Sequence, residues 1–218
     1  MLNSIKNNGG FYIGKYEVGY ELEEGESVRY YGEDFSTEHP ITQIPVIKEN
    51  AYPYNWVRVS QAQELSESLA TGGKTSSLMF GTQWDLVLKY LSVKENGKTE
   101  AELTSFNSVW GNCFSATFDI TQGKYSEDNG ATWKNVEGTY TKPIAVGVLL
   151  TTGATATNSS MNIYDLAGNV GEITLEKSSS DESVIRAGLR IAYKDQSGNY
   201  IIGSVFRCST SSYAGRGE

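Results

Sequence analysis

The chain has 218 residues, of which 18 are Lys or Arg and 26 are Asp or Glu, so its formal net charge at pH 7 is −8. This acidic balance, without any run of basic residues, argues against a nucleic-acid partner, because phosphate binding depends on clustered Lys and Arg. No apolar stretch approaches the roughly 18 residues of a membrane-spanning helix, so no membrane insertion is expected, and residues 1–8 lack the features of a secretory signal. With 39% hydrophobic residues we expect one domain over residues 1–218.

Two regions near the N-terminus have different patterns. Residues 10–18 form an aromatic and β-branched run opened by a Gly pair, which predicts a strand. Residues 21–50 are acidic and have no helical or alternating period, which predicts a connecting segment or a short strand pair. The one histidine, His39, stands beside Pro40 in this polar stretch and is expected to lie in a loop.

Two helices are predicted from the spacing of apolar residues. The first covers 61–70, with apolar residues on one face, Ser60 as its N-cap and a Gly pair after its end. The second covers about 82–91, where Thr82 and Asp85 resemble a capping box and apolar residues again recur at helical spacing.

The middle of the chain predicts short strands and turns. Residues 92–108 are a polar connection, and 114–118 and 132–136 read as strands on either side of a turn at 126–130. This turn begins an S-x-D-x-G-x-x-W run, the pattern of an Asp-box turn, whose expected role is structural. The apolar residues 144–150 are a buried strand or part of a helix.

A family resemblance rests on residues 162–174, which read N-I-Y-D-L-A-G-N-V-G-E-I-T. They resemble N-x-Y-D-M-x-G-N-V-W-E-W-T, the signature of the formylglycine-generating-enzyme (sulfatase-modifying factor) family. Further blocks in family order are the 10–17 run, the helix start at 81–85 and a closing 184–208 stretch similar to R-G-G-S…G-F-R-C. The resemblance implies an α+β, C-type-lectin-like fold of the sulfatase-modifying type, with short twisted antiparallel sheets, two helices and long ordered loops.

The sequence also departs from the family pattern. Gly171 and Ile173 stand where the signature has tryptophans, so either the core is rebuilt there or these positions face solvent. The family's enzymes hold copper(I) with a pair of cysteine thiolates in the closing segment, and no cysteine lies between Arg186 and Arg207. Cys113 and Cys208 form no metal-ligand spacing, and a disulfide between them is left open. We therefore do not expect an enzyme.

The family also contains binding proteins, which suggests another role for the closing segment. In the variable proteins of diversity-generating retroelements, including phage tropism determinants, this part of the fold displays a mutable ligand-binding face. Residues 189–204 here are rich in side-chain types common in binding surfaces, although an ordinary polar loop would look similar. The expected contact residues for a protein or glycan ligand are Arg190, Tyr193, Asp195, Asn199 and Tyr200.

The resemblance carries further expectations about cofactor, location and assembly. Family members can hold Ca²⁺ around the G-N-V-W-E motif, so Asn169 and Glu172 are candidate metal ligands, with a turn amide and a buried carboxylate as the structural alternative. The chain is expected to be the distal display module of a longer protein on a virion or a cell surface. The alternatives are a structural tip or spacer of a tail or pilus, which would favour a homo-oligomer, and a divergent enzyme of the sulfatase-modifying type.

Overall fold

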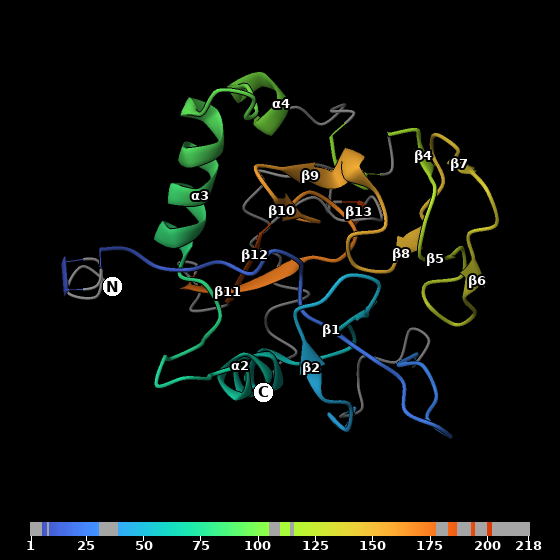
Figure 1. The fold of residues 1–218 in the computed structure, drawn as a ribbon, viewed down its shortest axis with the longest axis horizontal. Coiled ribbons are helices and arrows are strands. Elements are labelled where there is room, and N and C mark those ends of the chain that lie inside the picture. Colours follow the sequence, from blue (N-terminus) through green and yellow to red (C-terminus); the bar gives the residue numbers. More distant parts are fainter. Residues whose placement is uncertain are drawn as a thin grey trace.

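The computed structural model describes residues 6–7, 9–30, 39–104, 110–113, 116–177, 183–186, 193–194 and 200–201. Short strands form several small antiparallel sheets, and α-helices flank them (Figure 1). The α+β class expected from the sequence is therefore confirmed.

The first sheet joins the N-terminal segment to the chain just before the first long helix. Strand β1 (Gly19–Tyr20) lies between β2 (Pro45–Val46) and β3 (Tyr52–Pro53), and both pairings are antiparallel. Tyr20 is buried here with Tyr54 and Leu65, and its ring packs edge-on against that of Tyr54. The predicted strand at 10–18 is wrong, because the described regular strand begins only at Gly19.

Three α-helices are described, one more than the sequence predicted: α2 (Val59–Ser68), α3 (Gly81–Val93) and α4 (Glu100–Thr104). Both predicted helices are confirmed, with α2 starting two residues earlier than expected. The short α4 falls inside the stretch that was predicted to be a polar connection. Helix α3 stands beside the sheets, and α4 follows it at one end (Figure 1).

The predicted caps of α2 and α3 are wrong. Both helices instead use a glutamine in the first turn, whose side-chain oxygen accepts a hydrogen bond from the backbone N–H just before the helix. Gln61 accepts from the N–H of Arg58, and Gln83 from that of Phe80, each at 2.9 Å. Ser60 consequently lies inside α2, and Thr82 lies inside α3. A glutamine at this position can supply one half of a capping box without a Ser or Thr partner.

Two further sheets lie in the middle of the chain. Strand β4 (Phe118–Ile120) pairs with β7 (Tyr140–Lys142), and β5 (Lys124–Ser126) lies between β6 (Lys134–Asn135) and β8 (Leu149–Leu150). The predicted turn at 126–130 therefore lies in a hairpin, but its first strand is β5 and not residues 114–118. The segment 144–150 contributes the two-residue strand β8.

The signature segment contains the last described elements. A 3₁₀ turn, η1 (Ala156–Asn158), leads into the paired β9 (Ser159–Ser160) and β10 (Ile163–Tyr164). Strand β11 (Glu172–Lys177) then pairs with β12 (Ser183–Arg186), and β13 (Tyr193–Lys194) with β14 (Tyr200–Ile201).

Two larger apolar clusters hold these elements together. The first packs Trp84 and Leu91 of α3 against Trp110 and against Ile163 and Leu166 of the signature segment. The second is built from β4, β8 and their neighbours: Cys113, Ala116, Phe118, Ile120, Val148, Leu150 and Ala154. Gly171 and Ile173, which replace tryptophans of the family signature, are both partly exposed, so no large cavity has to be filled at either position.

A buried arginine links α3 to the β11–β12 hairpin. The side chain of Arg186 is 3% exposed, and its guanidinium donates hydrogen bonds to Glu176 of β11 and to Asp85 of α3. Asp85 was predicted to cap α3 but instead binds this arginine. The Asp85 side chain is half exposed, whereas that of Glu176 is 18% exposed, so Glu176 is the partner held in the less polar environment.

We expect Arg186→Met to lower the free energy of unfolding by about 3 kcal/mol, because it removes this cation from a buried carboxylate. Asp85→Asn should cost less than about 1 kcal/mol, because water screens the exposed partner. Urea denaturation of both variants tests the prediction. Equal losses for the two variants would contradict it.

Candidate functional site

The signature segment follows an unusual backbone path. Four non-glycine residues, Met161, Asn162, Asp165 and Asn169, have φ between 53° and 66°, and Gly168 has φ of +81°. Asparagine and aspartate tolerate this left-handed conformation better than most residues do. The segment therefore makes tight turns that direct short polar side chains into the interior.

Gly168 lies against the backbone of Asn112. A Cβ atom at Gly168 would lie 2.3 Å from the Asn112 carbonyl oxygen, and a parallel β-bridge joins the two residues. Asn112 N–H also donates to the Ala167 carbonyl at 3.0 Å. Only glycine meets both requirements at this position, a positive φ and a close backbone neighbour.

The side-chain amide of Asn169 is the centre of a buried hydrogen-bond network. Its Oδ1 accepts from the Leu150 N–H at 2.9 Å and from Asn112 Nδ2 at 3.0 Å. Its Nδ2 donates to the Leu150 carbonyl at 3.1 Å and to Oε1 of Glu17. All the hydrogen-bonding positions of this amide are therefore occupied by protein groups.

Three acidic side chains lie close together beside this amide: Glu17, Asp165 and Glu172. Asp165 is fully buried, and its Oδ2 accepts from the Gly153 N–H at 2.6 Å. One oxygen of each carboxyl is buried without a hydrogen-bond partner: Glu17 Oε2, Asp165 Oδ1 and Glu172 Oε2. These residues come from the N-terminal segment, from the turn after β10 and from the start of β11.

The environment of this cluster favours protonated carboxyls. Burial raises the pKa of Asp165 to about 7. Burial first, and the neighbouring Asp165 charge second, raise the pKa of Glu17 well above its ordinary value. Burial and the charges of Glu17 and Asp165 do the same to the pKa of Glu172. The cluster can therefore hold protons at a pH where exposed carboxylates are ionised.

Asn169 and Glu172, the predicted calcium ligands, both lie at this cluster, and Glu17 interacts with each of them. Calcium takes six to eight oxygen ligands. Both acceptor positions of Asn169 Oδ1 are already used, and no group of three His, Cys, Asp or Glu side chains in the described ranges is placed to hold a metal ion. This arrangement does not present a calcium ligand set, and calcium binding stays a prediction.

Sequence reasoning missed Glu17 and Asp165. A signal existed for each: Glu17 is an acid inside the apolar run at the N-terminus, and Asp165 belongs to the Y-D pair of the signature. Their approach to one another could not be predicted, because 148 positions separate them along the chain.

The predicted contact residues fall in and around the β13–β14 hairpin. Tyr193 pairs with Ile201 and Lys194 with Tyr200, so the two tyrosines stand on successive rungs of the ladder. Residues 195–199 connect the two strands. Arg190, Asp195 and Asn199, and the side chains of Tyr193 and Tyr200, lie outside the described residues.

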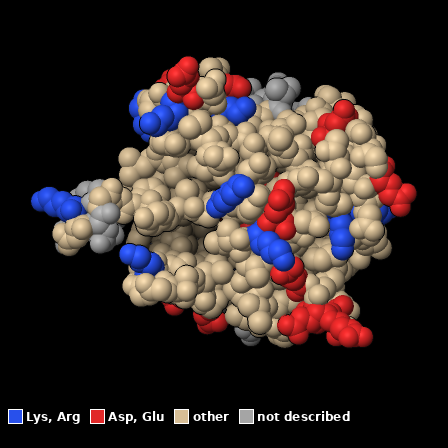
Figure 2. Space-filling model, in the orientation of Figure 1, with Lys and Arg blue, Asp and Glu red and all other residues tan. Residues whose placement is uncertain are grey.

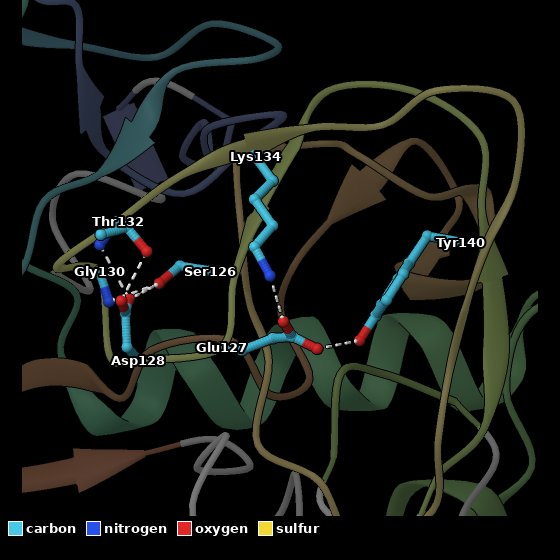
Figure 3. Close-up of polar contacts among 7 residues, drawn as sticks. All are labelled: Ser126, Glu127, Asp128, Gly130, Thr132, Lys134 and Tyr140. Atoms are coloured by element: carbon cyan, nitrogen blue, oxygen red, sulfur yellow. Dashed lines mark hydrogen bonds and ion pairs between the residues drawn. The ribbon is translucent and has the colours of Figure 1, made fainter.

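A second polar group surrounds the turn after β5 and has the geometry of the predicted Asp-box (Figure 3). Asp128 accepts hydrogen bonds from the Ser126 hydroxyl at 2.7 Å and from the Thr132 N–H at 2.8 Å, and Trp133 Nε1 donates to the Gly130 carbonyl at 3.0 Å. Although burial opposes the shift, the hydrogen bonds from Thr132 and Ser126 lower the pKa of Asp128 to about 2. The expected structural role of this turn is consistent with these contacts.

Two side chains with nucleophilic chemistry, Cys113 and Lys142, are held in the interior. Burial raises the pKa of the Cys113 thiol to about 11, and burial lowers the pKa of the Lys142 ammonium to about 8. Lys142 Nζ donates to the carbonyl of Ala116 at 2.7 Å.

His39 lies outside regular structure, as expected, and its carbonyl accepts from Gln61 Nε2 at 2.6 Å. Cys208 lies outside the described residues, so its pairing with Cys113 stays open.

Comparison with protein-family models, with curated proteins and with solved structures found no match to this chain. The resemblance to the formylglycine-generating-enzyme family thus stays a prediction. Among the described residues, no helix combines the length and the apolar character needed to cross a membrane. On the face shown in Figure 2, basic side chains are scattered among acidic ones and do not gather into a patch.

We expect the chain to lose stability as pH rises from about 4.5 to 7.5. A carboxyl with a raised pKa in the folded state binds its proton more tightly there than in the unfolded chain. Its contribution to stability is complete below the ordinary pKa of about 4, and it is lost as pH rises through the pKa of the folded state. Thermal unfolding in EDTA across this range measures the effect. The pKa of Lys142, which burial lowers to about 8, lies above this range. Asp165→Asn should flatten the profile, and an unchanged slope in that variant would contradict the assignment.

The calcium prediction has its own test. If calcium binds at Asn169 and Glu172, millimolar CaCl₂ at about pH 7.5 raises the unfolding temperature of the wild type and leaves that of Glu172→Gln unchanged, because a ligand that binds only the folded state stabilises it. No shift in the wild type would contradict the prediction.

We expect Gly168→Ala to destabilise the chain by about 3 kcal/mol or more, because the new methyl group meets the Asn112 backbone and the residue has positive φ. Gly138 is a matched control, since its φ is +74° and nothing lies within 4 Å of a Cβ there. Gly138→Ala should cost only about 1 kcal/mol, the conformational part alone. Urea denaturation compares the two variants, and similar losses would contradict the role given to the Asn112 contact.

Proposed function

We propose that the chain is a non-catalytic ligand-binding domain with a C-type-lectin-like fold of the sulfatase-modifying type, displayed on a virion or cell surface. It binds a protein or a glycan through a contact face composed of Arg190, Tyr193, Asp195, Asn199 and Tyr200. The observation that carries the proposal is the β13–β14 hairpin, because two of these residues lie in its strands and two more in the five-residue connection between them.

The physical properties of these residue types support a binding role. Tyrosine supplies rigid contact area at a low cost in side-chain entropy, and Arg and Asp supply charge-assisted hydrogen bonds that select a partner. The hairpin follows β12, and Arg186 of β12 is fixed by Glu176 and Asp85. Arg190 follows this anchored arginine by four positions in the sequence.

The three buried carboxyls raise the question of whether the chain is an enzyme. Converging acids with raised pKa values are a feature of many active sites. Two hollows of the described surface are lined by other residues, one by the 125–140 region and one by residues 26–30 with Thr42 and Gln43. Neither hollow is lined by Glu17, Asp165 or Glu172. Asp165 and Glu17 accept hydrogen bonds from groups of the protein itself, and each of the three acids has a buried carboxyl oxygen, so we assign them to the frame of the domain.

The proposal is tested with the full chain, labelled with a fluorophore, on a panel of intact bacterial cells read by flow cytometry. We expect binding to at least one strain, and a loss of roughly 30-fold in apparent affinity for at least one of Tyr193→Ala and Tyr200→Ala, because buried tyrosines commonly dominate interface energies. The two variants are measured separately, because positions on successive rungs lie on opposite faces of the two-stranded ladder.

Tyr12→Ala is the control, because Tyr12 is 96% exposed and lies outside the hairpin. It should bind as the wild type does, and all three variants should keep the wild-type unfolding temperature. Unchanged binding in both hairpin variants would refute the contact face. A solution oligomer that occludes the hairpin would support a spacer module of a larger assembly instead.

A further inference from the structure

A shallow hollow lies beside the Asp-box turn and is lined by other residues than those of the contact face proposed above. Its volume is about 380 Å³. Strands β5, β6 and β7 and the connection before β7 supply its lining residues: Tyr125, Lys134, Asn135, Glu137, Thr139 and Tyr140. We propose that this hollow binds a pyranose ring of a neutral carbohydrate.

The wall of the hollow is aromatic. The rings of Tyr125 and Tyr140 stack at a centroid separation of 4.0 Å with 18° between their planes, and both residues are partly exposed. Stacking covers one face of each ring and fixes the orientation of both, so the ring surface that remains at the hollow is held in place. The C–H faces of a sugar ring are apolar and suit such a surface, and no ring has to be immobilised on binding.

A hydrogen bond holds the Tyr140 hydroxyl in place (Figure 3). This hydroxyl donates to Glu127 Oε1 at 3.0 Å, and the other oxygen of Glu127 binds Lys134 Nζ at 2.7 Å. Glu127 lies between Ser126 and Asp128, which the Asp-box contacts hold in position. The turn thus orients the carboxylate, and the carboxylate orients the tyrosine and the lysine at the hollow.

The rim has unused hydrogen-bonding groups. Asn135, Glu137 and Thr139 are exposed, and their side chains have no polar partner among the described residues. An amide, a carboxylate and a hydroxyl together offer donors and acceptors, as a sugar hydroxyl, itself both donor and acceptor, requires.

The charges around the hollow favour a neutral ligand. The Lys134 ammonium is paired with Glu127, and the unpaired charge on the rim is the carboxylate of Glu137. An anionic ligand would meet repulsion from Glu137 and from the net charge of −8. A neutral, hydroxyl-rich ring is not repelled by either charge and can pack against the tyrosine rings.

The experiment uses the full chain and saturation-transfer NMR with four neutral hexasaccharides at millimolar concentration: cellohexaose, mannohexaose, maltohexaose and chitohexaose. We expect at least one to bind with a measurable Kd. Asn135→Ala should weaken that Kd about fivefold through one lost hydrogen bond, and Tyr140→Ala at least tenfold through the lost wall. Tyr12→Ala should leave it unchanged.

Because Asn135 is exposed, Asn135→Ala is expected to fold normally even if Tyr140→Ala does not, and it keeps the test decisive. Failure of all four sugars to bind, or an unchanged Kd in Asn135→Ala, overturns the proposal. Binding that is lost in Tyr193→Ala and kept in Asn135→Ala also overturns it, and supports the contact face on the hairpin. A loss confined to Asn135→Ala and Tyr140→Ala supports the hollow and leaves the hairpin proposal to its own test.

Discussion

The amide of Asn169 joins parts of the chain that lie far apart in the sequence. It binds the backbone of β8, the side chain of Asn112 and the carboxyl of Glu17. Removing one partner of such a buried group leaves the others unsatisfied, which costs more than a single surface hydrogen bond. The amide reaches these three partners because the backbone at Asn169 is left-handed and because Gly168 lies against Asn112.

The acidic cluster is a consequence of the same arrangement. Glu17 enters the interior to accept from Asn169, and it meets Asp165 and Glu172 there, so three acids share a poorly solvated space. Three buried negative charges would repel one another strongly, and protonation relieves this repulsion. The network that holds the fold together thereby makes its stability depend on pH.

The sequence predicted the elements whose signal is local and long. The apolar spacing of α2 and α3 extends over several turns, whereas strands of two or three residues are too short for an alternating pattern to distinguish them from loops. The caps were missed because Gln61 and Gln83 act from inside the helix. In the buried site, Asn169 and Glu172 were found through a motif, but Glu17 reaches them only through the tertiary fold.

The Asn169 network and the Asp-box turn differ in how far their hydrogen bonds are exposed to water, and this difference separates the frame of the fold from its surface. Around Asn169 the hydrogen bonds are internal, so substitutions there are expected to affect stability first. Around the Asp-box, Asp128 accepts a hydrogen bond from Thr132 and Glu127 accepts one from Lys134, so these exposed residues are held in defined positions at the surface. Turn contacts already hold the side chains of such a site in position, and its rim keeps side chains that make no hydrogen bond within the described part of the protein. A ligand can therefore bind there without the entropy cost of ordering the site.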